Sequence, residues 1–285
     1  MGDGSFTPRL GNMKALLGIV AGAGASYGIY RLISGGSFKR SKKNDPSDTA
    51  GVRSSQPDEV NVALQRGSLL AKDLIREFEG IPIIAGFLSD PEAEARVQTL
   101  NALNNLCMNL PNQEQIKVYV PQVLELIEVS PVNSDLQLGA LRLLTNLSVT
   151  DKHQHLLKKS ITLLLSILVV SNETLQVQAL KVLVNLSSNP DMMDDIVQAQ
   201  VRAPASVILL IDARTSPAVL RRLLLFVGNL KAWRPSAQVA DELRRKQDCL
   251  FRVMLDESSQ FHSRLVQVLS HPDGEIQAQV ARILA

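Results

Sequence analysis

The sequence predicts an all-α fold, a solenoid of stacked helical repeats, and two observations lead to this prediction. The first is a repeated block, because residues 140–148 (ALRLLTNLS) have counterparts at 99–106, 179–187 and, more weakly, 223–230. The second is leucine at every third position of a block, as at Leu141, Leu144 and Leu147, which forms one apolar face of a helix. Such a helix cannot bury its apolar face alone, so stacked neighbours must supply the core.

Composition agrees with thin helical layers and argues against several other classes. Hydrophobic residues make up 45% of the 285 residues and aromatic residues only 4%, so aliphatic side chains fill the core. The net charge of +2 is too balanced to indicate a nucleic-acid-binding protein. Cys107 and Cys249 have neither disulfide-framework nor metal-site spacing, so nothing requires an oxidising compartment.

The N-terminal part of the chain predicts a membrane anchor. After an N-terminal tail, residues 1–13, no charged residue occurs between Lys14 and Arg31. That run is shorter than the roughly 20 residues that usually span a bilayer, but the two flanking cations can reach toward the headgroups. We therefore expect a transmembrane signal anchor at residues 14–33. Because basic residues are denser after the run than before it, the C-terminal body should face the cytosol.

Other interpretations of this run remain open. A cleaved secretory signal peptide fits the basic start and the small residues 21–23, and it would leave a mature N-terminus near Ala25. Against it, a basic stretch follows the run and retains such a segment. A mitochondrial matrix presequence should be amphipathic and rich in arginine, which this run is not. Residues 34–60 are rich in Ser, Gly, Pro and charge, which predicts a disordered basic linker.

From residue 61 to 285 the sequence predicts the repeat domain, with three helices in each unit. The first unit should hold helices at 69–78, 82–88 and 92–108, with Gly80 permitting the turn and Pro82 beginning the second helix. The later units follow the same order, and a partial closing unit covers 271–284. The further helices expected are 112–118, 120–129, 136–148, 153–158, 161–170, 174–187, 192–200, 205–211, 218–231, 239–255 and 261–269.

The first unit, EGIPIIAGFLSDPEAEARVQTLNALNNL, resembles the armadillo consensus. Further blocks, among them SYGIYRL, IKVYVPQV, LLTNLSVTDKHQH and VQALKVLVNLSSNP, are similar to the mitochondrial armadillo repeat-containing family with its X-linked members. The resemblance implies a right-handed armadillo-repeat solenoid. In that family a further repeat precedes EGIPII, whereas only residues 60–70 occupy this place here, so the chain resembles a shortened form.

The same resemblance implies a location and partners. It implies an anchor in the mitochondrial outer membrane, or alternatively the endoplasmic reticulum membrane, with the repeats facing the cytosol. The implied role is a scaffold in mitochondrial distribution and dynamics and in cell growth and survival. The implied partners are the mitochondrial Rho GTPase, its kinesin adaptor and p53. A rival interpretation is a soluble or nuclear regulator that binds transcription factors, with an incidental N-terminus.

Catalytic and metal-binding motifs are missing from the sequence. It contains no Walker loop, no G-x-S-x-G and no H-E-x-x-H. His153 and His155 are two positions apart in a helical stretch, so their side chains should point about 200° apart and cannot chelate one ion together. We therefore expect no enzyme activity, no cofactor and no metal site.

The asparagines Asn105, Asn146, Asn185 and Asn229, one in each repeated block, are the candidate binding residues. In armadillo proteins the third helix lines a groove, and this asparagine can hydrogen-bond the backbone of an extended peptide. The alternative is a structural role, in which each amide bonds the backbone of a neighbouring repeat. Arg142 lies four residues before Asn146, and Lys181 lies four residues before Asn185. Their positive charges would suit an acidic segment of a partner.

Overall fold

The structure, a computed structural model, describes residues 70–285. The predicted tail (1–13), signal anchor (14–33, flanked by Lys14 and Arg31), linker (34–60) and first residues of the repeat domain lie outside the described residues. Among residues 70–285, no helix is both long and apolar enough to cross a membrane. The described residues fall into two units, divided between Gly80 and Ile81. In the first unit, residues 70–77 are helical.

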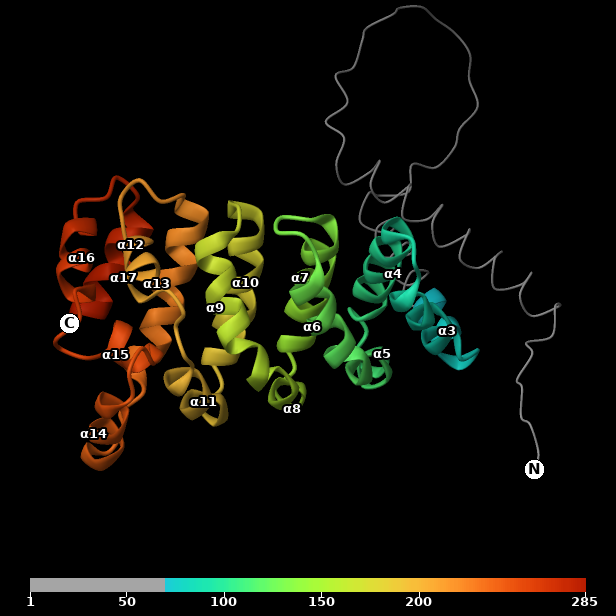
Figure 1. Cartoon of the computed structure of the whole chain (residues 1–285), viewed down its shortest axis with the longest axis horizontal. Helices are drawn as coiled ribbons and strands as arrows, with labels where there is room; N and C mark the ends of the chain where they lie inside the picture. The colour runs from blue at the N-terminus through green and yellow to red at the C-terminus, as the bar shows by residue number, and fades with distance from the viewer. Residues whose placement is uncertain (1–69) are drawn as a thin grey trace, which may run out of the picture. The chain divides into compact units, whose positions relative to one another are not determined.

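The predicted order of helices recurs along the chain (Figure 1). The first repeat contains α3 (Gly80–Gly86), a short 3-10 helix η1 (Phe87–Ser89) and α4 (Ala93–Leu106). The second contains α5 (Leu110–Ile116), η2 (Lys117–Tyr119), α6 (Val120–Val129) and α7 (Asp135–Ser148). The third contains α8 (Asp151–Gln154), η3 (His155–Ser160), α9 (Ile161–Val170) and α10 (Glu173–Ser187).

The C-terminal repeats continue the pattern. The fourth contains η4 (Pro190–Met192), α11 (Met193–Gln198), α12 (Pro204–Leu209) and α13 (Pro217–Ala232). The last helices are α14 (Ala237–Arg245), α15 (Leu250–Met254), α16 (Phe261–Val268) and α17 (Gly274–Leu284). The helix expected over 239–255 is therefore interrupted. Asp248 adopts a left-handed backbone conformation, and its carbonyl accepts a hydrogen bond of 2.7 Å from the Val201 amide. This link to the preceding repeat replaces helical bonding at residues 246–249.

Local sequence explains where the longest helices begin. Ser134 caps α7 by accepting a hydrogen bond from the Gln137 amide, and Asn172 caps α10 by accepting one from the Leu175 amide. Such caps satisfy backbone N–H groups that have no partner within the helix. Pro217 occupies the first position of α13, where the missing N–H carries no penalty.

The turn before α3 differs from the expectation. Glu79, and not Gly80, has the left-handed conformation, with φ of 56°. Gly80 is needed for another reason, since a Cβ atom there would lie 3.0 Å from the carbonyl oxygen of Ile75. The glycine therefore permits a close approach of two backbone segments.

The third helices of successive repeats, α4, α7, α10, α13 and α17, pack against one another in chain order (Figure 1). The predicted leucine face is confirmed, because the leucines at three-residue spacing are buried in these helices. In α7, for example, Leu141, Leu144 and Leu147 are at most 1% exposed. The core is thus made jointly by adjacent repeats, as the one-sided leucine pattern requires.

Candidate functional site: the third-helix surface

The third-helix surface comprises the side chains of α4, α7, α10 and α13 that reach solvent beside the buried leucines. All four predicted asparagines lie here, half-buried, one on each helix: Asn105, Asn146, Asn185 and Asn229. Each stands one position before a buried leucine near the C-terminal end of its helix. The repeat spacing therefore located equivalent positions correctly.

Two of these asparagines bind a buried serine of the preceding repeat. The Asn185 side-chain amide donates to the Ser148 hydroxyl (2.9 Å) and to the Thr145 carbonyl (3.4 Å). The Asn229 amide donates to the Ser187 hydroxyl (3.0 Å). Each serine can accept because its own proton is donated one turn back within its helix; the Ser148 hydroxyl, for example, bonds the Thr145 carbonyl.

Asn146 and Asn105 have no such serine partner, for two different reasons. In the first repeat Cys107 occupies the serine position, and a thiol is a weak acceptor. Asn146 accordingly donates to Asn104, to its side-chain oxygen (2.9 Å) and its carbonyl (3.3 Å). The Asn105 side chain makes no hydrogen bond to any residue from 70 to 285, a range in which no third helix precedes α4.

Three of the four asparagines thus bond the preceding repeat: Asn146 and Asn185 reach its backbone, as the structural alternative expects, and Asn229 reaches a side chain only. All these hydrogen bonds are donated by the amide nitrogen Nδ2, while the amide oxygen Oδ1 accepts none from the described residues. A backbone carbonyl acceptor fixes this orientation at Asn146 and Asn185, since only the nitrogen can donate. Any ligand would therefore meet an amide oxygen, which can accept from a peptide N–H.

This network also gives the Asn-Leu-Ser sequences at 146–148 and 185–187 a physical basis. Both match the acceptor pattern for N-glycosylation, yet Ser148 and Ser187 are at most 2% exposed. Their hydroxyls serve as acceptors for the next repeat.

A row of three cations lies on the same surface. Arg142 on α7 is exposed, and Lys181 on α10 and Arg222 on α13 are half-buried. Partial burial lowers the pKa of Lys181, and the charges of Arg222 and Arg142 lower it further, so the three groups are close enough to repel one another. None of the three has an ion-pair partner within residues 70–285.

The contribution of Arg222 could not be read from the sequence. Arg221 and Arg222 are adjacent and chemically identical, but only the fold distinguishes them. Arg221 pairs with Asp273 and, at 3.0 Å, with Glu275 of the last repeat. Arg222 instead donates to the Ala218 carbonyl (2.7 Å) and remains available to a ligand.

Sequence reasoning also missed two buried glutamines that join the repeats. The Gln154 side chain donates to the Ser148 carbonyl (2.7 Å) and to the Asn185 carbonyl (3.3 Å), so it links the ends of α7 and α10. Gln113 makes the corresponding bonds between α4 and α7. The two lie one repeat apart, and this spacing, the same as that of the asparagines, was the signal that could have identified them.

Residues 70–285 contain no cluster of three or more His, Cys, Asp or Glu side chains that could hold a metal ion. His153 is buried, with its Nε2 atom 3.1 Å from a Glu114 carboxylate oxygen, whereas His155 is exposed. Glu114 also meets Lys117 and Lys152, and hydrogen bonds from these groups lower its pKa to about 2. This cluster links the second and third repeats.

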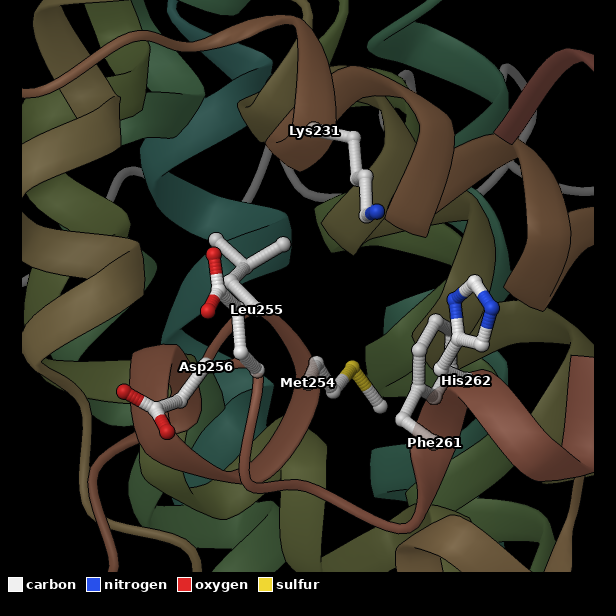
Figure 2. Close-up of a pocket in the computed structure, with 7 residues that line it drawn as sticks. Lys231, Met254, Leu255, Asp256, Phe261 and His262 are labelled. Atoms are coloured by element: carbon white, nitrogen blue, oxygen red, sulfur yellow. The ribbon is translucent and has the colours of Figure 1, made fainter. Parts of the chain in front are cut away.

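Two cavities flank Lys231 at the C-terminal end of α13. One, of about 240 Å³, has Met254 and Phe261 as apolar walls, with the Lys231 ammonium and His262 beside them (Figure 2). In Figure 2 the Asp256 carboxylate points away from the Lys231 ammonium. It accepts hydrogen bonds from Arg244 and from the Ser258 amide. The second, of about 380 Å³, is lined by Asn229, Lys231, Arg234 and Arg282 among others.

Known proteins similar to this chain share the architecture. The family model described as Armadillo-like matches residues 65–255. Among solved structures, computationally designed armadillo repeat proteins for modular peptide recognition align with a TM-score of 0.62 and 16% identity, over 81% of this chain and 94% of theirs.

Two further structures align over 81% of this chain. A designed armadillo repeat protein in complex with the peptide (KR)4 does so with a TM-score of 0.61 and 15% identity, over 94% of its own length. An engineered protein aligns with a TM-score of 0.60 and 19% identity, over 91% of its length. Identities this low indicate a shared fold and carry no information on ligands.

Proposed function

Because the chain belongs to the armadillo-like family, we propose that it is a non-enzymatic scaffold whose third-helix surface binds an extended, acidic segment of a partner protein. The observation that carries this proposal is the row Arg142, Lys181 and Arg222, three cations on successive repeats without an ion-pair partner among residues 70–285. The adjacent asparagines contribute the second element, since their free Oδ1 atoms can accept from the backbone of a peptide.

Charge determines the kind of segment. One designed relative in fold is complexed with the basic peptide (KR)4. Here the corresponding helices carry mutually repelling cations, so a basic peptide would add to the repulsion, whereas carboxylates would relieve it. Side chains alternate along an extended peptide, so every second residue can face the cations while the backbone meets the asparagines.

We further propose that residues 14–33 tether this scaffold to the mitochondrial outer membrane, with the repeats in the cytosol. The support is the charge-free run between Lys14 and Arg31, the basic residues that follow it, and the resemblance to the mitochondrial armadillo repeat-containing family. A tether raises the local concentration of the repeats, so that weak contacts on the third-helix surface suffice for recruitment. By that resemblance the partners are the mitochondrial Rho GTPase with its kinesin adaptor, in organelle distribution, and p53, in growth control.

Peptide binding can be tested with a fluorescent peptide of alternating aspartate and alanine, and with the same peptide carrying lysine for aspartate. Combined Arg142→Gln, Lys181→Gln and Arg222→Gln should weaken binding of the acidic peptide about tenfold to thirtyfold, since each exposed pair contributes up to ~1 kcal/mol. Added salt should weaken it as well.

A charge-matched control replaces three exposed cations outside the third helices: Lys159→Gln, Arg202→Gln and Arg245→Gln. This variant has the same net charge as the first, so it should retain the binding of the wild type. Equal losses in both variants, or tighter binding of the lysine peptide, would refute the acidic-segment proposal.

The tether is tested separately by deleting residues 14–33 from the full chain and fractionating cells beside markers of the mitochondrial outer membrane and endoplasmic reticulum. We expect the intact chain to sediment with mitochondria and the deleted chain to become soluble. A deleted chain that still sediments would contradict the anchor, and an intact chain in the nucleus would favour the regulator of transcription factors such as p53.

A further inference from the structure

The second cavity at the C-terminal end of α13 has an unusual composition. Three cationic residues, Lys231, Arg234 and Arg282, line it together with Asn229, and no acidic side chain does. None of the three cations forms an ion pair or hydrogen bond with any residue of the described range 70–285. The side chains that line the site therefore carry an excess of positive charge.

Gly228 determines where one of these cations lies. Each of the four repeat asparagines follows a different residue. This residue is Asn104, Thr145 or Val184 in the earlier repeats but Gly228 in α13. A Cβ atom at Gly228 would lie 2.7 Å from the Nη2 atom of Arg282, so the end of this flexible, exposed side chain would have to shift. The guanidinium of α17 thus occupies the space that a side chain of α13 would take, immediately beside Asn229.

A glycine inside a helix lowers the stability of the helix relative to alanine, and at Gly228 it leaves room for the Arg282 guanidinium. The guanidinium is planar and offers paired N–H donors, which match the oxygens of a phosphoryl group or carboxylate. Lys231 borders both cavities, and in Figure 2 its ammonium lies in the smaller one. Its flexible stem lets the ammonium reach a ligand in either cavity.

We propose that this cavity binds a phosphoryl group carried by the acidic segment, at the end of the cationic row. The proposal rests on the proposed function, because the cavity includes Asn229 of the third-helix surface. A phosphoserine carries a charge of about −1.5 to −2 and three acceptor oxygens, whereas a carboxylate carries −1 and two. Two guanidinium groups, those of Arg234 and Arg282, with the Lys231 ammonium within reach, match the first ligand better than the second.

The test compares three acidic peptides that differ at one terminal position, which is phosphoserine, serine or glutamate, with that position placed at either end. For one of the two orientations, the phosphoserine peptide should bind wild-type protein about tenfold tighter than the serine peptide, and the glutamate peptide should fall between them or match serine. Equal affinities of all three in both orientations would overturn the proposal. Phosphoserine and glutamate peptides of equal affinity would assign the cavity to carboxylates instead.

Gly228→Ala keeps every charge and adds one methyl group where the Arg282 guanidinium lies, so the end of this arginine side chain must move. Arg282→Gln should abolish the phosphoserine advantage, and Gly228→Ala, which displaces the end of the Arg282 side chain, should reduce it, while neither changes the affinity for the serine peptide. Gly274→Ala is the matched control, since a Cβ there, at the start of the same helix α17, meets no atom within 4 Å. A phosphoserine advantage that survives in Arg282→Gln would contradict the assigned site.

A second measurement separates this inference from the proposed function. In the full chain labelled with ¹⁵N, a phosphoserine tripeptide without an acidic tract should shift the backbone amide signals of Gly228 and Asn229, and a serine tripeptide should not. Absence of shifts would refute the cavity even if acidic peptides bind elsewhere on the third-helix surface. Shifts without any binding of acidic peptides would uphold the cavity and refute the proposed function.

Discussion

The link between Asn185 and Ser148 provides the most direct test of how the repeats are held together. Asn185→Ala removes one side chain that donates to both the Ser148 hydroxyl (2.9 Å) and the Thr145 carbonyl (3.4 Å). A typical intramolecular hydrogen bond contributes a net ~1 kcal/mol. The longer bond is the weaker of the two, so we expect the free energy of unfolding to fall by about 1–2 kcal/mol.

The companion variant Ser148→Ala removes the acceptor and should cost about 1 kcal/mol. Because the two side chains share one hydrogen bond, their losses should not add, and a double-mutant cycle should give a coupling of about 0.5–1 kcal/mol. Urea unfolding followed by circular dichroism measures each free energy. The repeats of a solenoid can unfold separately. The free energies are therefore valid only if the transition followed by tryptophan fluorescence coincides with the one followed by circular dichroism.

Asn105→Ala supplies the internal control. Asn105 has the same repeat position but no hydrogen-bond partner among residues 70–285, so its removal should change the free energy of unfolding by less than about 0.5 kcal/mol. If the asparagines also bind peptide, Asn105→Ala and Asn185→Ala should both lower the affinity for the acidic peptide. Only Asn185→Ala should lower the free energy of unfolding. A coupling below about 0.3 kcal/mol, or an equal loss of stability in Asn105→Ala, would refute the role of this network.

Three further changes test the packing and the electrostatics. Leu144→Ala, in a fully buried position of α7, should cost about 2–5 kcal/mol in urea unfolding, and a cost below 1 kcal/mol would argue against a shared core. Gly139→Val should cost about 1–3 kcal/mol in the same assay, because a Cβ there lies 3.2 Å from the Cβ of Leu100 on α4; a neutral result would show that α4 and α7 can separate. The pKa of Glu114 is lowered to about 2 in the folded chain, so its stabilising effect is present above pH 4.5 and is lost as the pH falls toward 2. Glu114→Gln should flatten the acid dependence of the melting temperature in that range, and an unchanged dependence would contradict the cluster.

The repeat architecture was predictable from the sequence because it is encoded locally. A leucine at every third position defines one apolar face within a single helix, and its recurrence defines the period, so the third helices and their asparagines were assigned correctly. Several boundaries, such as α9 at Ile161–Val170, also follow from local apolar runs. The split between α14 and α15 was not predictable, because Asp248 is held by Val201 of another repeat.

The chemistry of the surface was decided by the tertiary structure. No local pattern shows that Ser148 accepts from Asn185, that Arg221 is neutralised while Arg222 is not, or that Arg282 takes the space beside Gly228. These partners are about forty or more positions apart, and they meet only because adjacent helices stack at one rotation and height. The spacing of leucines fixes which side of each helix is buried, but the packing of side chains between two helices determines which polar groups come within hydrogen-bonding distance.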